Sequence, residues 1–328
     1  MSNCTDKDEK ESRRALSEQL EHRTLAMFHV GEYVFKKVQN NVVKGRNKEK
    51  YDSFIRDAER YNHSDNIVVK TAIGKKWAPR SSGYDYDYDA SFFANLIYQN
   101  TIFPDGKIEA KSKDPCEFEY VIRCNGACYR GDTMNSWQTT VNNFIQEKTG
   151  IKRSVSLDHL INHPMEFPPY ITHFLSTVYT IGNFIPVPVI SDFNRRRYSL
   201  SDDYWDLTLL AIYCYYMGFG NSKEWGKLLE ESEVWLGQKG EKNWDHFVEK
   251  NFLQDFVNQK AGGGYGLPKE LWDGHFFGSH LPGNEKDFEQ FFTNASAWIL
   301  ARGMRLVLAL EKREALDKEM QNSTKEDK

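Results

Sequence analysis

The sequence contains no long hydrophobic run, and this absence excludes a protein anchored by transmembrane helices. No stretch approaches the roughly 18 consecutive apolar residues that a spanning helix needs. The first segment, MSNCTDKDEKESRR, also lacks the apolar centre of a secretory signal peptide. We therefore expect a soluble, cytoplasmic protein that has no membrane partner.

Cysteine is scarce, and the net charge is small. The 328 residues include five cysteines, an odd number that favours a reduced intracellular protein over a disulfide framework. The formal net charge of −4 gives no general attraction to nucleic acid or to anionic membranes. Binding of nucleic acid would therefore have to come from a local basic segment.

Three patterns that often mark metal or phosphate sites are present only in part. The aspartates of YDYDYD (84–89) alternate with tyrosines, but the other ligand positions of a calcium loop are missing. Cys124 and Cys128 lack the paired CxxC spacing of a zinc site. The glycine-rich segment 262–266 lacks the Gly-Lys-Ser/Thr ending of a phosphate loop. We therefore predict no metal ligands from these patterns, and the cofactor stays unknown.

Helical periodicity dominates the chain, with a few short strand patterns between the helices. Segment 118–122 alternates as a strand does, whereas 288–316 has the apolar spacing of a long helix. The sequence therefore predicts a helix-dominated α+β fold with a small sheet and a largely buried central helix. The expected organisation is an N-terminal helical appendage at 1–62, a single main α+β domain at 63–316 and a polar tail at 317–328.

The strongest local pattern lies in residues 179–220. It reads as a short apolar strand, a polar loop with the arginines 195–197, and a largely apolar helix. Ser201 and Asp202 are good N-cap residues, and Asp203 adds negative charge to the first turn, where the helix dipole favours it.

Asp206 lies within the apolar run of that helix and needs a partner if it is buried. Two interpretations stay open. Either an arginine from 195–197, or Arg130, forms an internal clamp with Asp206, or one or two of these arginines remain free to hold a phosphate or carboxylate.

A second polar group, RGDTMNSW (130–137), follows a predicted strand. We expect Asp132 or Thr133 to cap a helix that begins near Asn135, or the helix N-terminus to bind an anion. A pocket between this junction and the arginine loop would suit a nucleotide or another phosphorylated ligand. The predicted ligand-binding residues are Arg130, Asp132, Thr133, Asn135, Asn183, Asn194, Arg195, Arg197 and Asp203.

Several segments share an order and spacing with one group of proteins. They are RGDTMNSW (130–137), YTIGNF (179–184), the Asn–Arg segment 194–197, SDDYWDLTLLAIYCYY (201–216), FLQDFV (252–257) and ARGMRL (301–306). Together they resemble an uncharacterised bacterial family defined only as a domain of unknown function. The resemblance spans roughly residues 85–308 and implies membership, with no activity attached to it.

LDHLINHP (157–164), YTIGNF and Asn194 also resemble, in order, segments of HNH-type endonucleases from modification-dependent restriction systems. This resemblance implies that His159 is a general base beside a divalent metal held partly by Asp158. Tyr179 stands where that pattern has histidine, and prolines interrupt the interval, so we expect His159 to lie on a surface helix instead. The catalytic candidates are His159, Asp158 and Asp132, and a divalent metal is expected only for this nuclease interpretation.

The function expected from these patterns is binding of a nucleotide-like or nucleic-acid phosphate through the local basic loop, extending to phosphodiester hydrolysis. The alternative is a non-catalytic interaction module, in a phage-defence or stress-response system, with an exposed aromatic patch around Trp235–Trp244. The sequence leaves open whether the protein is an enzyme, which ligand it takes and how it oligomerises.

Overall fold

The structure is a computed structural model, and it describes a defined part of the chain. The described residues are 92–110, 120–135, 140, 144, 146, 168–178, 180–202, 204–278 and 281–326. Helices predominate there, and the strands form small antiparallel sheets, which confirms the helix-dominated α+β prediction. The predicted appendage 1–62 and the site candidates Asp158, His159 and Asp203 lie outside the described residues.

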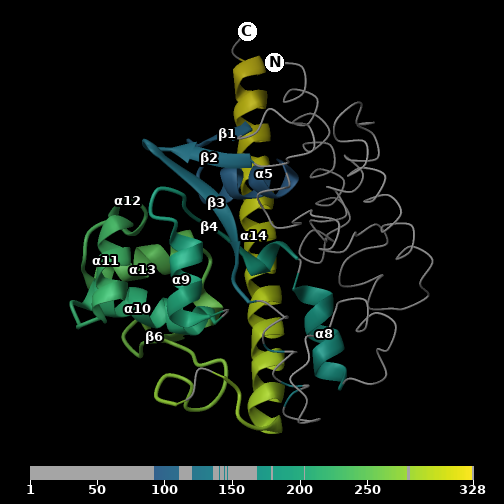
Figure 1. Ribbon diagram of the computed structural model, residues 1–328. Coiled ribbons are helices and arrows are strands. Elements are labelled where there is room, and N and C mark those ends of the chain that lie inside the picture. The colour runs from purple at the N-terminus through teal and green to yellow at the C-terminus, as the bar shows by residue number, and fades with distance from the viewer. Residues whose placement is uncertain are drawn as a thin grey trace, which may run out of the picture.

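A four-stranded antiparallel sheet with the order β1-β2-β3-β4 crosses the upper part of the molecule (Figure 1). Strand β4 lies at the edge, and it contains both Pro186 and Pro188. An edge strand tolerates proline because the missing N–H need not pair with a further strand. The strands are β1 (Lys107–Ala110), β2 (Tyr120–Cys124), β3 (Ala127–Thr133) and β4 (Phe184–Pro188).

Asn125 and Gly126 form the two-residue turn between β2 and β3. Both have positive φ, 48° for Asn125 and 78° for Gly126. Two consecutive positive φ values are typical of the type I′ turn, whose twist matches that of the flanking strands. The Asn-Gly pair therefore fixes the register of this hairpin, in which Cys124 lies opposite Ala127.

The long helix α14 (Glu285–Glu326) is the axis against which the other elements pack (Figure 1). It contacts α5 (Phe92–Thr101), α8 (Pro169–Thr177) and the short 3₁₀ helix η5 (Ile181–Asn183). Gly182 allows the closest approach, because a Cβ there would lie 1.9 Å from the carbonyl oxygen of Ile299. Any side chain at position 182 would force η5 and α14 apart.

A group of helices lies beside α14 and forms the other half of the described structure (Figure 1). Its centre is α10 (Trp205–Met217), whose side chains Trp205, Leu209 and Ile212 are fully buried. This confirms the predicted buried central helix. Around it lie α9 (Phe193–Ser201), α11 (Lys223–Glu231), α12 (Glu233–Leu236), α13 (Glu241–Lys250), η6 (Gln254–Phe256) and the strand pair β5 (Val257–Gln259) and β6 (Tyr265–Pro268).

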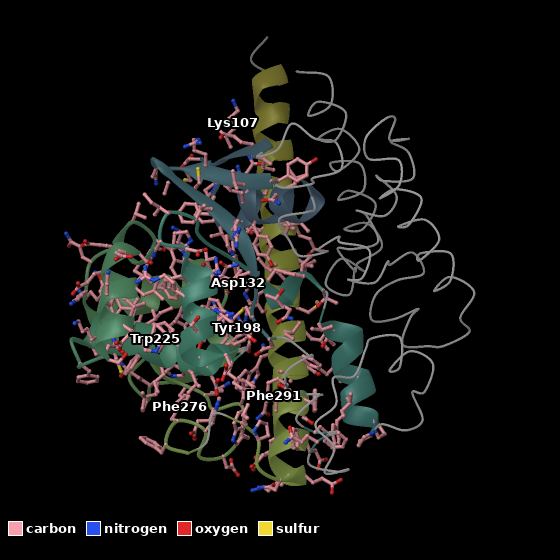
Figure 2. All side chains as sticks on the ribbon, viewed as in Figure 1. Lys107, Asp132, Tyr198, Trp225, Phe276 and Phe291 are labelled. Atoms are coloured by element: carbon pink, nitrogen blue, oxygen red, sulfur yellow. The ribbon has the colours of Figure 1, made fainter. Side chains whose placement is uncertain are left out.

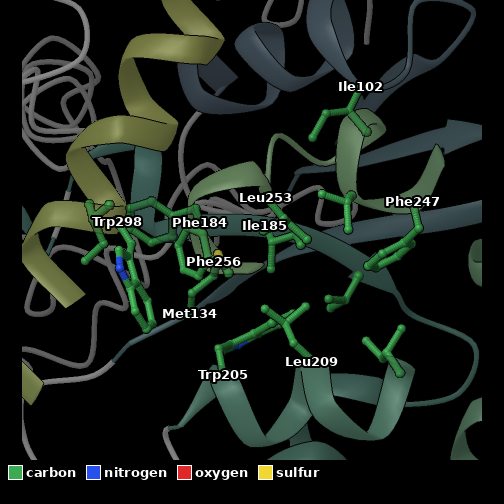
Figure 3. Close-up of a cluster of buried hydrophobic side chains, with 14 of the residues drawn as sticks. Ile102, Met134, Phe184, Ile185, Trp205, Leu209, Phe247, Leu253, Phe256 and Trp298 are labelled. Atoms are coloured by element: carbon green, nitrogen blue, oxygen red, sulfur yellow. The ribbon is translucent and has the colours of Figure 1, made fainter. Parts of the chain in front are cut away.

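One continuous apolar core joins the two halves. Trp205 and Leu209 of α10 point toward Met134 and Ile185 at the end of the sheet (Figure 3). The exposed aromatic patch expected around Trp235–Trp244 is wrong, since Trp244 is fully buried and Trp235 is 6% exposed. Both rings pack on Phe247 inside the helical group, where large aromatic surfaces gain most from burial.

The arginine segment is a helix and not the predicted loop. Residues 193–201 form α9, because Phe193, Arg197 and Ser201 recur every four residues and all face inward. The expected N-cap at Ser201 and Asp202 is also wrong. Ser201 ends α9, Asp202 links the helices with a φ of 48°, and α10 begins at Trp205.

None of the described helices combines the length and apolar character that crossing a membrane requires.

Candidate functional site

The polar residues singled out by the sequence meet where β3 ends and α10 begins. Asp132 of β3 accepts a hydrogen bond from Nε of Arg197, at 3.0 Å. Nη1 of Arg197 donates to the backbone oxygen of Asp202, and its guanidinium lies 5.3 Å from the centre of the Trp205 ring. Arg197 is 2% exposed, so this is a buried, multiply bonded charge pair that ties α9 to the sheet.

Asp132 and Thr133 lie within strand β3, and the helix that they were expected to cap near Asn135 falls largely outside the described residues, so the capping role stays a prediction. In the ladder with β4, Asp132 pairs with Ile185 and Thr133 pairs with Phe184. The strand continues through RGDT because β4 supplies a hydrogen-bonding neighbour along this whole stretch. The side chain of Asp132 is thereby directed at α9, which explains its pairing with Arg197.

Asn183 and Asn135 form a buried structural link. The side-chain amide of Asn183 donates to the backbone oxygens of Asn135 and Val178, at 2.8 and 2.7 Å. Its oxygen accepts the Asn135 backbone N–H at 2.9 Å. Asn183 is fully buried, and its side chain satisfies three backbone groups at the point where the sheet ends.

Arg130 and the arginines 195–197 divide into two kinds. Arg197 is neutralised by Asp132, and Arg196 pairs with Glu231. Arg130 donates only to the neutral side-chain oxygen of Asn194, at 3.0 Å. Within the described residues, neither Arg130 nor the exposed Arg195 has a carboxylate partner.

The exposed side of α9 carries a basic, aromatic and hydroxyl group in close succession. Arg195, Tyr198 and Ser199 are spaced i, i+3 and i+4, which places them on one helix face. Tyr198 is 47% exposed, and Arg130 lies at the margin of this face through its bond to Asn194. Figure 2 shows Tyr198 on the same part of the molecule as Asp132. We call Arg130, Asn194, Arg195, Tyr198 and Ser199 the α9 outer face.

Asp206 is buried as predicted, but its partner is His275 and no arginine. Its Oδ2 lies 2.6 Å from Nδ1 of His275 and also accepts the backbone N–H of Leu271 at 2.8 Å. Its Oδ1 accepts the backbone N–H of Leu207. The predicted ion pair between Asp206 and an arginine is wrong, because α9 directs Arg197 toward the sheet, where Asp132 neutralises it.

His275 was absent from the sequence-based candidates. It lies 69 positions from Asp206, in the irregular segment between β6 and α14. A buried carboxylate inside an apolar helix indicated that some partner must exist, but no local spacing identified which one. The imidazole is 1% exposed, stacks on Trp272 at 3.5 Å between ring centres and meets Tyr204 edge to face.

Two arginines of ARGMRL on α14 bind the segments YTIGNF and FLQDFV or the residue just before FLQDFV. Arg302 is fully buried and donates to the backbone oxygens of Asn251, Gly182 and Phe184, with the first two bonds at 2.9 Å. Arg305 forms a two-pronged pair with Asp255. The segments that stood out in the sequence are therefore neighbours in the fold, held together by polar contacts.

No group of three potential metal ligands occurs among the residues that the structure describes. The nuclease-like arrangement stays a prediction, because Asp158 and His159 are outside those residues. Asp132, the third catalytic candidate, is engaged with Arg197.

Residues 133–306 match a family of unknown function, DUF6994, over more than half of the 328 residues. The chain belongs to this family. The DUF6994 match confirms the family resemblance seen in the sequence, and it includes α9, α10, His275 and Arg302. Comparisons with curated proteins and with solved structures give no match.

Proposed function

We propose that this DUF6994 protein binds a phosphate-bearing ligand, of the nucleotide or nucleic-acid class, on the α9 outer face. The observation that carries the proposal is the division of the arginines. Arg196 and Arg197 have carboxylate partners, whereas Arg130 and Arg195 keep an unneutralised charge in the described part of the chain. A guanidinium without a carboxylate partner is suited to bind phosphate oxygens through two parallel hydrogen bonds.

Tyr198 favours a ligand that carries a base as well as a phosphate. Its ring is about half exposed and lies one helical turn from Arg195. An exposed aromatic ring beside a cationic side chain can stack on a nucleobase while the cation holds the adjoining phosphate. Stacking of this kind contributes roughly 1–3 kcal/mol per base and tolerates any base.

The surrounding charges favour a short ligand over a long polyanion. Arg196 is neutralised by Glu231, and Asp192 is exposed at the start of α9. The overall net charge of −4 gives no general attraction to a long polyanion. The proposal is therefore for contact with about two phosphates, one for each free arginine.

The test compares three probes: inorganic phosphate, a mononucleotide and a short single-stranded oligonucleotide, with binding measured by calorimetry or fluorescence anisotropy. The oligonucleotide and the mononucleotide should bind more tightly than inorganic phosphate. Tyr198→Ala should weaken both nucleotide probes by about 1–3 kcal/mol and leave phosphate unchanged. Absence of binding by all three probes to the folded protein would overturn the proposal.

A further inference from the structure

Asp206 and His275 form a buried pair that is separate from the charged arginines. The carboxylate of Asp206 accepts two backbone hydrogen bonds, from the Leu271 and Leu207 N–H groups, and its Oδ2 lies 2.6 Å from Nδ1 of His275. Asp206 also lies in the first turn of α10, where the helix dipole favours negative charge. All of these contacts suit an ionised carboxylate.

An ionised Asp206 determines which nitrogen of His275 carries the hydrogen. Oδ2 can only accept, so Nδ1 at 2.6 Å must donate. In the neutral imidazole, Nε2 is then a bare acceptor. A carboxylate that holds Nδ1 and leaves Nε2 available is the arrangement by which acid–base histidines are oriented.

Nε2 of His275 is buried and has no hydrogen-bond partner among the described residues. A buried polar atom without a partner is costly, and such an atom in a folded protein calls for an explanation. A group that brings its own hydrogen to Nε2 would remove that cost. The unpartnered nitrogen therefore marks a position where a donor from outside the chain can bind.

The surroundings of the imidazole indicate what kind of donor fits. Trp272 stacks on one side, and Tyr204 presents its edge on another. The Tyr204 hydroxyl is itself paired with Thr140, and the nearby Glu270 carboxylate accepts the backbone N–H groups of Gly274 and Phe276. Aromatic walls disfavour a charged ligand and suit a neutral one.

His275 belongs to a turn whose neighbouring residues reach the surface. Gly274, on one side of it in sequence, is exposed, Phe276 on the other side is partly exposed (Figure 2), and Phe277 is 94% exposed. A small molecule would reach Nε2 only if this turn moved, because the imidazole itself is buried.

We propose that Asp206 and His275 form an acid–base pair, in which Nε2 of His275 accepts the proton of a hydroxyl group from water or a small neutral hydroxyl compound. Ester hydrolysis is a reaction of this class. Nε2 takes one proton from water as the water oxygen bonds to the acyl carbon. The carbon–oxygen bond to the leaving group breaks, the leaving oxygen keeps the electron pair, and the imidazolium returns its proton to solvent.

The first test reads the hydrogen position in the wild-type protein directly. Nitrogen NMR of labelled histidine, in mildly alkaline buffer, should show Nδ1 of His275 protonated and Nε2 bare. A protonated Nε2 beside a bare Nδ1 would overturn the proposal. This measurement needs no variant, so it decides the matter even if substitutions at position 275 impair folding.

The second test uses p-nitrophenyl acetate as a small neutral ester. His275→Asn places an amide N–H where Nδ1 lies, so it keeps the bond to Asp206 and removes Nε2. Its melting temperature should stay within a few degrees of wild type, while the rate of ester hydrolysis falls by about 10²-fold or more. The exposed His246 supplies the control, since His246→Asn should hydrolyse the ester at the wild-type rate. Equal rates for wild type and His275→Asn would refute the proposal, and neither result depends on phosphate binding at the α9 outer face.

Discussion

Arg197 and Asp132 form a buried ion pair that joins a helix to a strand, with Nε and Oδ2 3.0 Å apart. The pair removes Arg197 from any role in binding a ligand, because its guanidinium is almost fully buried and already bonded. Arg195, two positions earlier, faces solvent on the opposite side of the same helix. Opposite sides of α9 thus carry a structural arginine and a free one.

Asp132→Ala should destabilise the protein strongly, because it leaves the Arg197 guanidinium buried without its counter-charge. We expect a loss of about 3–5 kcal/mol in the free energy of unfolding, measured by urea denaturation. Glu109→Ala is the matched control. It removes an exposed ion pair with Arg123 and should cost less than about 1 kcal/mol. Equal costs for the two variants would contradict a structural role for the Asp132 pair.

Gly182→Ala tests the close approach of η5 to α14. The added methyl would lie 1.9 Å from the Ile299 carbonyl oxygen and 2.9 Å from the Gly303 nitrogen, both backbone atoms that cannot rotate away. Overpacking of this kind should cost about 3 kcal/mol or more in thermal or urea unfolding.

Gly226→Ala should stabilise the protein in the same assay, the opposite of the effect expected for Gly182→Ala. Gly226 lies inside α11, and nothing is within 4 Å of an added Cβ. Alanine there should raise the free energy of unfolding by up to about 1 kcal/mol, since it favours the helix. A Gly182→Ala protein as stable as wild type would show that α14 and η5 are farther apart than this structure has them.

At alkaline pH, deprotonation of buried tyrosines should dominate the change in the free energy of unfolding. Burial raises the pKa of Tyr129 to about 12, and burial also raises the pKa values of Tyr98, Tyr215 and Tyr216. The folded protein therefore holds these protons more tightly than the unfolded chain, whose tyrosines titrate near 10. This contribution to stability is complete below pH ~10 and is lost as the pH rises toward ~12.

Denaturant unfolding at a series of alkaline pH values checks this expectation. The free energy of unfolding should fall between pH ~10 and ~12, and Tyr129→Phe should show a smaller fall. At neutral pH the variant should resemble wild type, because the Tyr129 hydroxyl makes only a long contact, 3.5 Å, with the Val234 oxygen. A fall as steep in Tyr129→Phe as in wild type would exclude Tyr129 as a contributor.

Features with a local cause were predictable from the sequence. The buried helix α10 and the long helix α14 both follow from apolar spacing that a window of one element contains. The hairpin turn at Asn125 and Gly126 has an equally local cause, since Asn-Gly between two strands is a strong turn signal.

Features that depend on distant partners were not predictable. The sequence predicted a loop at 195–197 because three consecutive charged residues are untypical of a buried helix. The inward spacing of Phe193, Arg197 and Ser201 was therefore not recognised. The burial of Asp206 was expected from its apolar neighbours, yet its partner His275 lies in a segment with no periodicity. The choice between Asp132 and Asp206 as the partner of Arg197 depends on where α9 lies against the sheet, which only the tertiary structure determines.

The most direct test of the proposed function is the salt dependence of binding to a short single-stranded oligonucleotide. With Arg130 and Arg195 each contacting one phosphate, the logarithm of the association constant should fall against the logarithm of salt concentration with a slope of about −1.4. Arg195→Ala should halve that slope to about −0.7, because one phosphate contact is lost. Lys242→Ala, which removes an exposed cation on α13, should keep the wild-type slope. An unchanged slope in Arg195→Ala, or no measurable binding by the folded wild-type protein, would contradict phosphate recognition at the α9 outer face.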